Sequence, residues 1–378
     1  MKKLRTLVTG NGAAVAIWAL LWIVAIDLSI NLAFRNEARS SQQTSLGRYF
    51  DYGRSVEGKL ARMVAADPKD GGQMVSAGWA SPEILATLPS HPEPGHDMLM
   101  AVYGQSFALI AAKGAAQIDS RMTIRGVGGP GAPPSHSYAS YKADAPLRKA
   151  DVVVLGVLSA SVVNMRSLSG LIWMFASPAP YTFPYYRVVD GKLDEELPAL
   201  RTEAQFRDAF VRKSSDWSAF KAQMQRIDYG YDRATFDATV ADESAVVRLL
   251  RRGWVSHRQA YEDGVYTASE GFNPRAESLV ALKAMLVDLE RRTRERKERL
   301  VVLLLHTRGH ADHLNGVLEG ALKQAGIEYI STHTLFSAND PSNFLPDGHY
   351  AQDASTRLSK ALLAKVRSEP PLRGVPLR

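Results

Sequence analysis

Ser106 lies in a sequence setting that suits a nucleophile. It follows Gly104 at the end of the apolar run 98–103, and residues 107–118 have helical spacing. A glycine at the end of a buried strand permits a tight turn, and the N–H groups at the start of a helix favour negative charge. Because a serine that only caps a helix has the same surroundings, a second element is needed before the pattern indicates catalysis.

Asp347 and His349 supply that second element, in a loop directly before the predicted final helix, 352–366. An imidazole can act as a general base near neutral pH, and a nearby carboxylate can orient it and stabilise its charged form. Combined with the turn at Ser106, the two residues predict a catalytic triad for acyl transfer.

A second histidine-rich segment spans residues 306–316 and reads His-Thr-Arg-Gly-His-Ala-Asp-His-Leu-Asn-Gly. It is similar to the His-x-His-x-Asp-His zinc motif of metallo-β-lactamase-like hydrolases, and clustered His and Asp suit zinc. However, Arg308 takes the place of the first histidine, and too few residues follow for the rest of that fold. A zinc-dependent hydrolase is therefore an alternative, and a strand-to-helix loop is the simpler interpretation.

Short apolar runs alternate with helical patterns on both sides of these motifs. The predicted strands are 98–103, 122–125, 152–156, 300–305 and 327–330. This alternation is typical of an α/β fold with a mainly parallel sheet covered on both faces, a three-layer α/β/α sandwich. Ligands bind beyond the carboxyl ends of such strands, which is where the candidate residues stand.

The order of motifs resembles the SGNH (GDSL-like) hydrolase family over roughly residues 98–170 and 300–366. Gly104-Gln105-Ser106 is similar to the first family block, Arg125–Gly129 to the second, and Asp347-Gly348-His349 to the last. The resemblance implies that Ser106 is the nucleophile, His349 the base and Asp347 its orienting acid. It also implies that the Gly129 N–H belongs to the oxyanion hole, and the chemistry needs no metal or other cofactor.

Two features depart from the family pattern. His349 follows Asp347 by two positions, where the family usually has three. The third block, normally Gly-x-Asn-Asp, here reads Gly156-Val157-Leu158-Ser159, without the oxyanion asparagine. The replacement candidates are Ser159, Ser161 and Asn164. Since one lost donor typically costs about 10²–10³ in rate, a catalytically inactive relative is a second alternative.

The N-terminal region has the length and composition of a membrane anchor. Residues 13–34 are mostly apolar, about the length a helix needs to cross a bilayer, and basic residues precede them. Their far half contains Asp27, Ser29 and Asn31, which we expect near the outer interface. A cleaved signal peptide is the competing interpretation. The basic flank predicts a single-pass protein of the cytoplasmic (inner) membrane with its body on the periplasmic side.

The predicted organisation has six parts. They are a basic N-terminus (1–12), the transmembrane anchor (13–34), a stalk with a helical segment (35–97), the first part of the sandwich (98–174), a helical insertion or cap (175–299) and the second part of the sandwich (300–378).

Net charge and composition limit the classes of partner and chemistry that the sequence supports. The net charge is +7, but basic residues are interleaved with acidic ones and no nucleic-acid module is evident. The absence of cysteine excludes disulfides and thiolate nucleophiles. The family resemblance and the anchor together favour an O-acyl group on an envelope or exported polysaccharide as the substrate. The inactive alternative would be a glycan-binding or scaffold subunit of an envelope assembly.

Overall fold

The computed structural model describes residues 10–34, 44–65, 82–129, 131–261 and 264–368. The chain divides into two compact units. The first comprises Met1–Met74, Leu171–Pro180 and Gly230–Glu262, and the second comprises Val75–Gly170, Tyr181–Tyr229 and Asp263–Arg378. The basic N-terminal residues and the stalk segment 35–43 lie outside the described residues.

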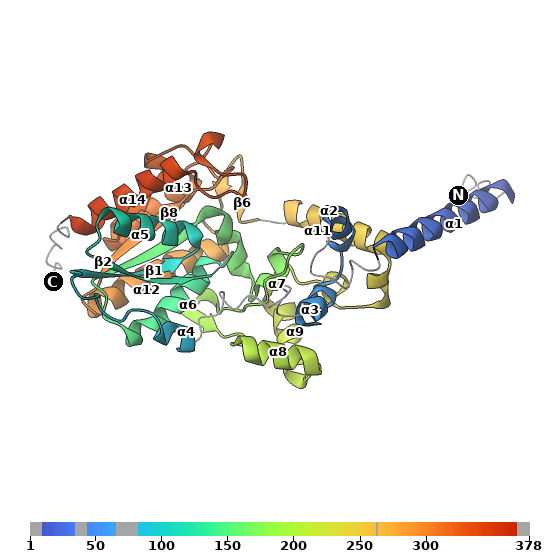
Figure 1. The fold of residues 1–378 in the computed structure, drawn as a ribbon, viewed down its shortest axis with the longest axis horizontal. Helices are drawn as coiled ribbons and strands as arrows, with labels where there is room; N and C mark the ends of the chain where they lie inside the picture. The colour runs from blue at the N-terminus through green and yellow to red at the C-terminus, as the bar shows by residue number, and fades with distance from the viewer. Residues whose placement is uncertain (1–9, 35–43, 66–81, 130, 262–263, 369–378) are drawn as a thin grey trace. The chain divides into compact units, whose positions relative to one another are not determined.

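A five-stranded sheet forms the centre of the second unit (Figure 1). Its strands, in spatial order, are β2 (Met122–Gly128), β1 (Met98–Gly104), β3 (Val152–Leu158), β8 (Arg299–Leu305) and β9 (Glu328–Ser331). Every neighbouring pair is parallel. The predicted α/β class with a parallel sheet is therefore confirmed.

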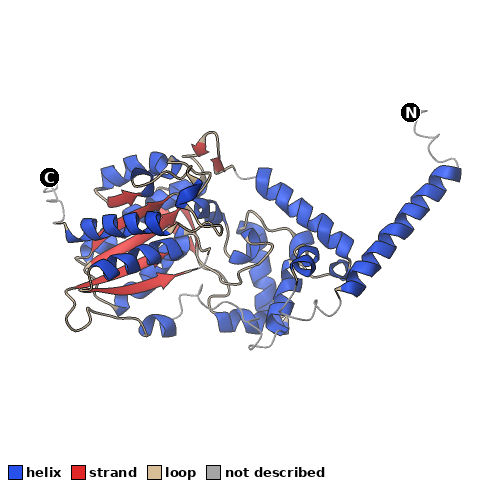
Figure 2. Ribbon diagram, turned by 45° about the horizontal axis from the view of Figure 1, so that its top comes forward, coloured by secondary structure: helices blue, strands red, loops and turns tan. Residues whose placement is uncertain are grey.

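Helices cover both faces of this sheet (Figures 1 and 2). On one face lie α5 (Ser106–Ile118) and α14 (Gln352–Arg367), and on the other lie α6 (Pro134–Asp144), α12 (Glu277–Glu295) and α13 (His313–Ala325). Successive strand residues point to opposite faces. In β1, Leu99 and Ala101 belong to the α12 core, whereas Met100 and Val102 belong to the α5 core.

Small residues bring the start of α5 close to the sheet. A Cβ atom added to Gly156 would lie 2.6 Å from the Ala108 Cβ, and one added to Gly104 would lie 3.0 Å from the same atom. Distances that short require a shift of backbone or side chain. The first turn of α5, which carries Ser106, therefore rests directly on β1 and β3.

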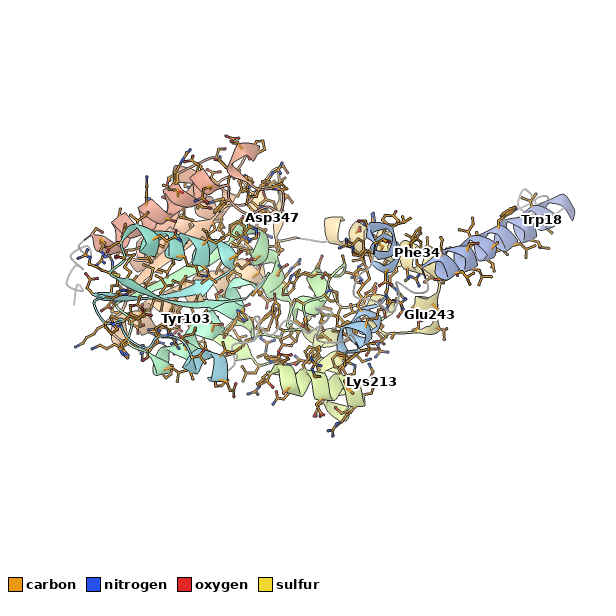
Figure 3. The ribbon with its side chains drawn as sticks, viewed as in Figure 1. Trp18, Phe34, Tyr103, Lys213, Glu243 and Asp347 are labelled. Carbon is orange, nitrogen blue, oxygen red and sulfur yellow. The ribbon has the colours of Figure 1, made fainter. Side chains whose placement is uncertain are left out.

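Arg125 of the second motif has a structural role in this core. Its guanidinium is buried and forms an ion pair with buried Asp144 of α6. The Tyr103 hydroxyl also donates to Asp144, with an oxygen–oxygen distance of 2.6 Å. Figure 3 shows Tyr103 inside the sandwich and Asp347 at its surface. The buried ion pair joins β2 to α6.

The range predicted as a helical insertion is only partly an insertion. It contains a hairpin of β4 (Tyr185–Val189) and β5 (Lys192–Glu196), followed by α8 (Glu203–Arg212) and α9 (Ser215–Ile227). Its last helix, α12, instead packs on the sheet and supplies Leu282, Leu286 and Leu289 to the core. The apolar stripe of α12 explains why it belongs to the sandwich layer.

The first unit contains the membrane-anchor candidate. α1 (Gly10–Ala33) is long and apolar enough to cross a membrane, with a mean hydropathy of 2.3 over Gly12–Ala33. The other helices of this unit are α2 (Ser45–Asp51), α3 (Val56–Ala65), α10 (Arg233–Phe236), η6 (Val240–Glu243) and α11 (Ala245–Tyr261).

The remaining elements are short. They are α4 (Pro82–Ala86), η4 (Ala145–Leu147), η5 (Ser159–Arg166), α7 (Gly170–Trp173), β6 (Tyr266–Thr267), β7 (Gly271–Phe272), η7 (Thr332–Thr334) and η8 (Pro341–Asn343).

Candidate active site

Ser106 is the first residue of α5 and lies directly beyond the carboxyl end of β1. Gln105 precedes it in extended conformation, with φ −82° and ψ 179°. The N–H of Ala108 donates the first hydrogen bond of the helix, to the Gln105 carbonyl at 3.0 Å. The N–H groups of Ser106 and Phe107 precede that bond, so they lie at the positive end of the helix dipole.

The structure brings Ser106, His349 and Asp347 together. Ser106 Oγ lies 2.7 Å from His349 Nε2, and His349 Nδ1 lies 3.1 Å from Asp347 Oδ2. The His349 side chain is 34% exposed and that of Asp347 is 65% exposed, so the pair is reachable from solvent. A hydroxyl, an imidazole and a carboxylate bonded in this sequence can activate the hydroxyl as a nucleophile.

Asp347 keeps its charge at neutral pH. The His349 backbone N–H donates to Asp347 Oδ1 at 3.1 Å. This hydrogen bond, followed by the one from the His349 imidazole, lowers the pKa of the Asp347 carboxyl below its ordinary value. An ionised carboxylate at Nδ1 leaves Nε2 of a neutral imidazole free to accept the serine proton.

A tight turn presents Asp347 and His349. The Gly348 N–H donates to the Leu345 carbonyl at 3.0 Å, and the Leu345 N–H donates to the His349 carbonyl at 2.7 Å. Gly348 has a φ of +89°, which favours glycine. Phe344 and Tyr350 pair across the base of this turn. The Leu-Pro-Asp-Gly sequence therefore fixes the spacing of acid and base.

Two aromatic side chains hold the His349 ring in place. Phe107 stacks on it, with ring centroids 4.9 Å apart and planes inclined by 18°. Tyr350 packs edge-on against Phe107, and its hydroxyl donates to the His306 carbonyl at the end of β8, at 2.8 Å. Burial raises the pKa of the Tyr350 hydroxyl well above its usual range. Tyr350 thus ties the loop that carries His349 to the sheet.

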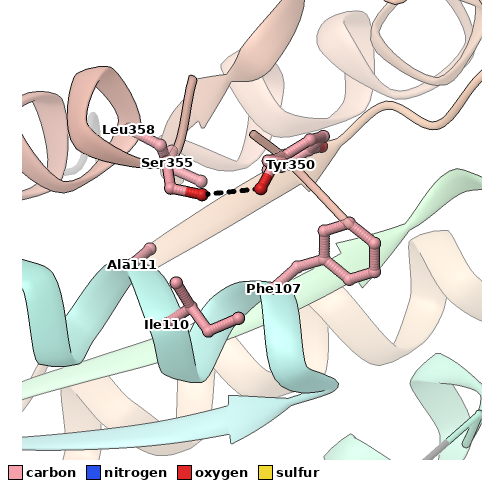
Figure 4. Close-up of a pocket in the computed structure, with 6 residues that line it drawn as sticks. All are labelled: Phe107, Ile110, Ala111, Tyr350, Ser355 and Leu358. Atoms are coloured by element: carbon pink, nitrogen blue, oxygen red, sulfur yellow. Dashed lines mark hydrogen bonds between the residues drawn. The ribbon is translucent and has the colours of Figure 1, made fainter. Parts of the chain in front are cut away.

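A small pocket lies between α5 and α14 (Figure 4). Its lining consists of Phe107, Ile110, Ala111, Tyr350, Ser355 and Leu358. The Ser355 hydroxyl donates to the Tyr350 carbonyl at 3.3 Å, on the side of the pocket opposite α5. The pocket shares two aromatic residues with the surroundings of His349, but the triad residues do not line it.

Gly129 lies in a crowded position directly after β2. A Cβ atom there would lie 2.8 Å from His136 Cε1, so a larger residue would displace the imidazole or the backbone. The Ala132 N–H donates to the Gly129 carbonyl at 3.1 Å. Gln105 Nε2 donates in turn to the Ala132 carbonyl at 2.7 Å. Gln105, beside the nucleophile, therefore links the Ser106 turn to the loop that begins at Gly129.

Ser159, Ser161 and Asn164, the three oxyanion candidates of η5, have different surroundings. Ser161 is buried, and its hydroxyl donates to the Leu158 carbonyl at 2.8 Å. Ser159 is buried, and its Oγ accepts the Thr307 N–H at 3.0 Å and bonds the Thr307 hydroxyl at 2.9 Å. That hydroxyl joins the segments that follow β3 and β8. Asn164 is half-buried, and its side-chain amide makes no hydrogen bond to another described residue.

The histidine-rich loop after β8 is internally bonded. Buried His306 bonds Thr332 Oγ1 through Nδ1 at 3.2 Å, and its Nε2 accepts the Asn315 N–H at 3.3 Å. Burial, and then the neighbouring His333, lower the pKa of His306 to about 4. His310 stacks on Tyr266 with centroids 4.3 Å apart. Among the described residues, no group of three or more His, Asp or Glu is arranged to hold a metal ion.

Phe107, Tyr350 and Gln105 were not predicted as parts of this site. Gln105 occupies the middle position of the first motif, and Tyr350 directly follows His349, so their places in the sequence gave a signal. Their roles depend on contacts with residues far away in the chain, which spacing does not reveal.

Comparisons with known proteins identify no family. No protein-family model matches the chain, and no curated protein sequence matches it. The chain is similar in structure to a candidate acylhydrolase from Bacteroides fragilis, with 8% sequence identity and a TM-score of 0.36. The similarity covers 76% of this chain and 96% of that one. At this level of similarity, only the geometry of the site informs its chemistry.

Proposed function

We propose that the protein is a serine hydrolase or acyltransferase that acts on an ester (O-acyl) group. The observation that carries the proposal is the chain of hydrogen bonds from Ser106 Oγ through His349 to Asp347. It lies beyond the carboxyl end of β1, at the start of a helix, where a tetrahedral intermediate with negative charge would be stabilised.

The proposed reaction has two halves. Ser106 Oγ attacks the ester carbonyl while His349 Nε2 takes its proton; the imidazolium then protonates the leaving alcohol, and an acyl-serine forms. A second hydroxyl next attacks the acyl-serine with His349 as base, and Ser106 regains its proton. Water as this second nucleophile gives an esterase, and a sugar hydroxyl gives a transferase.

The proposed oxyanion donors are the backbone N–H groups of Ser106 and Gly129. Each good donor supplies roughly 3–4 kcal/mol of transition-state stabilisation in well-studied hydrolases. For the third donor we propose the Asn164 amide, because the Ser159 hydroxyl is already bonded to Thr307. Asn164 lies in η5, the element that directly follows β3.

We further propose that α1 anchors the chain in the cytoplasmic membrane with the body on the periplasmic side. The length and hydropathy of α1 support a span. An envelope or exported polysaccharide is the proposed carrier of the O-acyl group, and proteins of envelope polysaccharide assembly are the proposed partners. Both follow from the predicted location and the motif resemblance.

A second candidate function is a catalytically inactive glycan-binding or scaffold subunit. The engaged Ser159 hydroxyl favours it, since the third block then lacks one of its possible donors. A fluorophosphonate probe distinguishes the two candidates, because an activated Ser106 would be labelled and a scaffold would not.

The deciding experiment measures hydrolysis of p-nitrophenyl acetate by the full-length chain in detergent. Wild type is compared with Ser106→Ala and His349→Ala, and the exposed Ser342 of η8 provides the matched control Ser342→Ala. Loss of activity in the first two variants and its retention in the third support the triad. A well-folded wild type that is no faster than Ser106→Ala would refute the enzyme proposal.

A further inference from the structure

The polar end of α1 is joined to α11 within the first unit. Asp27 Oδ1 accepts hydrogen bonds from the Ser244 hydroxyl at 3.0 Å and the Val246 N–H at 2.9 Å. Asp27 therefore lies at the start of α11, where the helix dipole stabilises a carboxylate. Asn31 Oδ1 accepts a bond from Arg248 Nη2 at 3.0 Å. These contacts explain why the far half of an otherwise apolar helix is polar.

Two arginine residues of α11, Arg248 and Arg251, point inward. Arg248 Nη1 donates to the Asp242 carbonyl at 2.6 Å, and Arg248 Nε donates to the Phe50 carbonyl at 2.8 Å. Arg251 is also buried, where it pairs with the Asp242 carboxylate and donates to the Gly53 carbonyl at 3.1 Å. The two guanidinium groups therefore bond α2, η6 and the Gly53 carbonyl to α11 and do not face solvent.

The outward face of α11 carries two large apolar side chains, beside the exposed Gly253, Ser256 and His257. Leu250 is 69% exposed and Trp254, one turn further, is 54% exposed. Val240 of η6, just before α11, is 92% exposed. A helix facing water normally has the opposite arrangement, with charges outside and apolar groups inside. Large apolar side chains left exposed on a helix mark a surface that meets another apolar phase.

We propose that Val240, Leu250 and Trp254, the α11 apolar face, lie in the headgroup–acyl boundary of the membrane that α1 spans. The hydrogen bonds of Asp27 and Asn31 hold α11 at the end of that span, and both helices leave this junction in different directions (Figure 2). Tryptophan is enriched at such boundaries, and interfacial helices bury one apolar face there. The proposal rests on the membrane part of the proposed function and is independent of its hydrolase chemistry.

The chain has no cysteine, so a single introduced thiol can carry a spin label. We would label Leu250→Cys and, separately, Trp254→Cys in the full-length protein in lipid nanodiscs. Electron paramagnetic resonance measures how often each label collides with oxygen, which is concentrated in lipid, and with a nickel chelate, which stays in water. Val24→Cys in α1 is the lipid control, and Val211→Cys in α8, 57% exposed, is the water control.

The expected oxygen-to-nickel collision ratio at positions 250 and 254 is several-fold above that at position 211 and approaches that at position 24. Free nickel access at both α11 positions, with a lipid-exposed label at position 24, would overturn this inference and leave the anchor intact. A water-exposed label at position 24 would overturn both. Shielding from both reagents would also overturn the inference, because a polypeptide would then cover the face. Spin–spin broadening would identify that polypeptide as a second copy.

Discussion

Two histidine-containing loops follow the sheet strands of the second unit, and they use their histidines differently. The loop after β8 contains His306, His310 and His313, and the turn before α14 contains only His349. In the first loop the imidazoles bond threonine and backbone groups or stack on Tyr266. In the second, the imidazole bonds a serine on one side and a carboxylate on the other. The number of histidines is therefore a poorer indicator of chemistry than the partners of each one.

The largest expected difference between the loops is in catalysis. Replacing His349 with alanine removes the base, and we expect kcat/KM to fall by about 10³–10⁴-fold. His310→Ala, in the loop after β8, is the matched change. Its kcat/KM should stay within about threefold of wild type, because substitutions outside the site usually have small effects. Ester hydrolysis by the two purified variants measures this difference. Equal losses would show that the loop after β8 takes part in the reaction.

The second prediction concerns stability in acid. The pKa of His306 is about 4 in the folded protein, below the value near 6.5 expected after unfolding. Between these values the unfolded chain binds a proton that the folded chain does not, so the free energy of unfolding falls as pH drops from 6.5 to 4.5, by about 2–3 kcal/mol. Denaturant titrations at the two pH values measure this loss.

His306→Gln should remove most of that pH dependence, whereas His310→Gln should retain it. Glutamine cannot make both of the hydrogen bonds that His306 makes to Thr332 and Asn315. The free energy of unfolding of this variant at pH 7 should therefore be lower than that of wild type by about 1–3 kcal/mol. An unchanged acid loss in His306→Gln would assign the effect to another group.

The third prediction tests the acid of the triad. Asp347→Asn removes the charge that stabilises the imidazolium, but Asp347 is 65% exposed, so water can replace part of its effect. We expect kcat/KM to fall by about 10–10²-fold, less than for a buried triad acid. The low pKa of Asp347 also predicts that wild-type activity shows no loss from its protonation between pH 8 and 6. A loss as large as that of His349→Ala would contradict this interpretation of an exposed acid.

The smallest expected effect comes from replacing one glycine in each loop with alanine. Gly348 and Gly309 have φ values of +89° and +80°, and neither has an atom within 4 Å of an added Cβ. Alanine at either position should therefore cost about 1 kcal/mol from backbone strain alone. Only Gly348→Ala should also slow the reaction, by a few-fold, because it displaces His349. Thermal unfolding and ester hydrolysis of both variants separate the two effects.

The sheet was predictable because its strands are short, continuous apolar runs. Val152–Leu158 and Arg299–Leu305 lie close to the predicted ranges, and a fully buried parallel strand leaves that pattern in any sequence. The β4–β5 hairpin was missed, although Asp190-Gly191 at its turn is a strong hairpin signal in the sequence. Both residues have the positive φ that this kind of turn requires. Nearby prolines and charged residues obscured it.

The triad geometry was predictable in part. The types of Ser106, Asp347 and His349 and their places after strands suggested a common site, and the structure places the three side chains in contact. The stacking of Phe107 on His349 was not predictable, because it joins positions far apart in the chain. The bond between Ser159 and Thr307 was hidden for the same reason, since a serine hydroxyl gives no signal of its partner.

The contact between α1 and α11 has a consequence for biosynthesis. Ser244 and Val246 follow Asp27 by 217 and 219 positions. At a synthesis rate of roughly 5–20 residues per second, Asp27 is made about ten to forty seconds before these partners exist. The proposed span is therefore made before the α11 partners of Asp27 exist, and β1 to β3 leave the ribosome before α11. The first unit is thus begun before the second, but it is completed only after β1 to β3 of the second unit have been made.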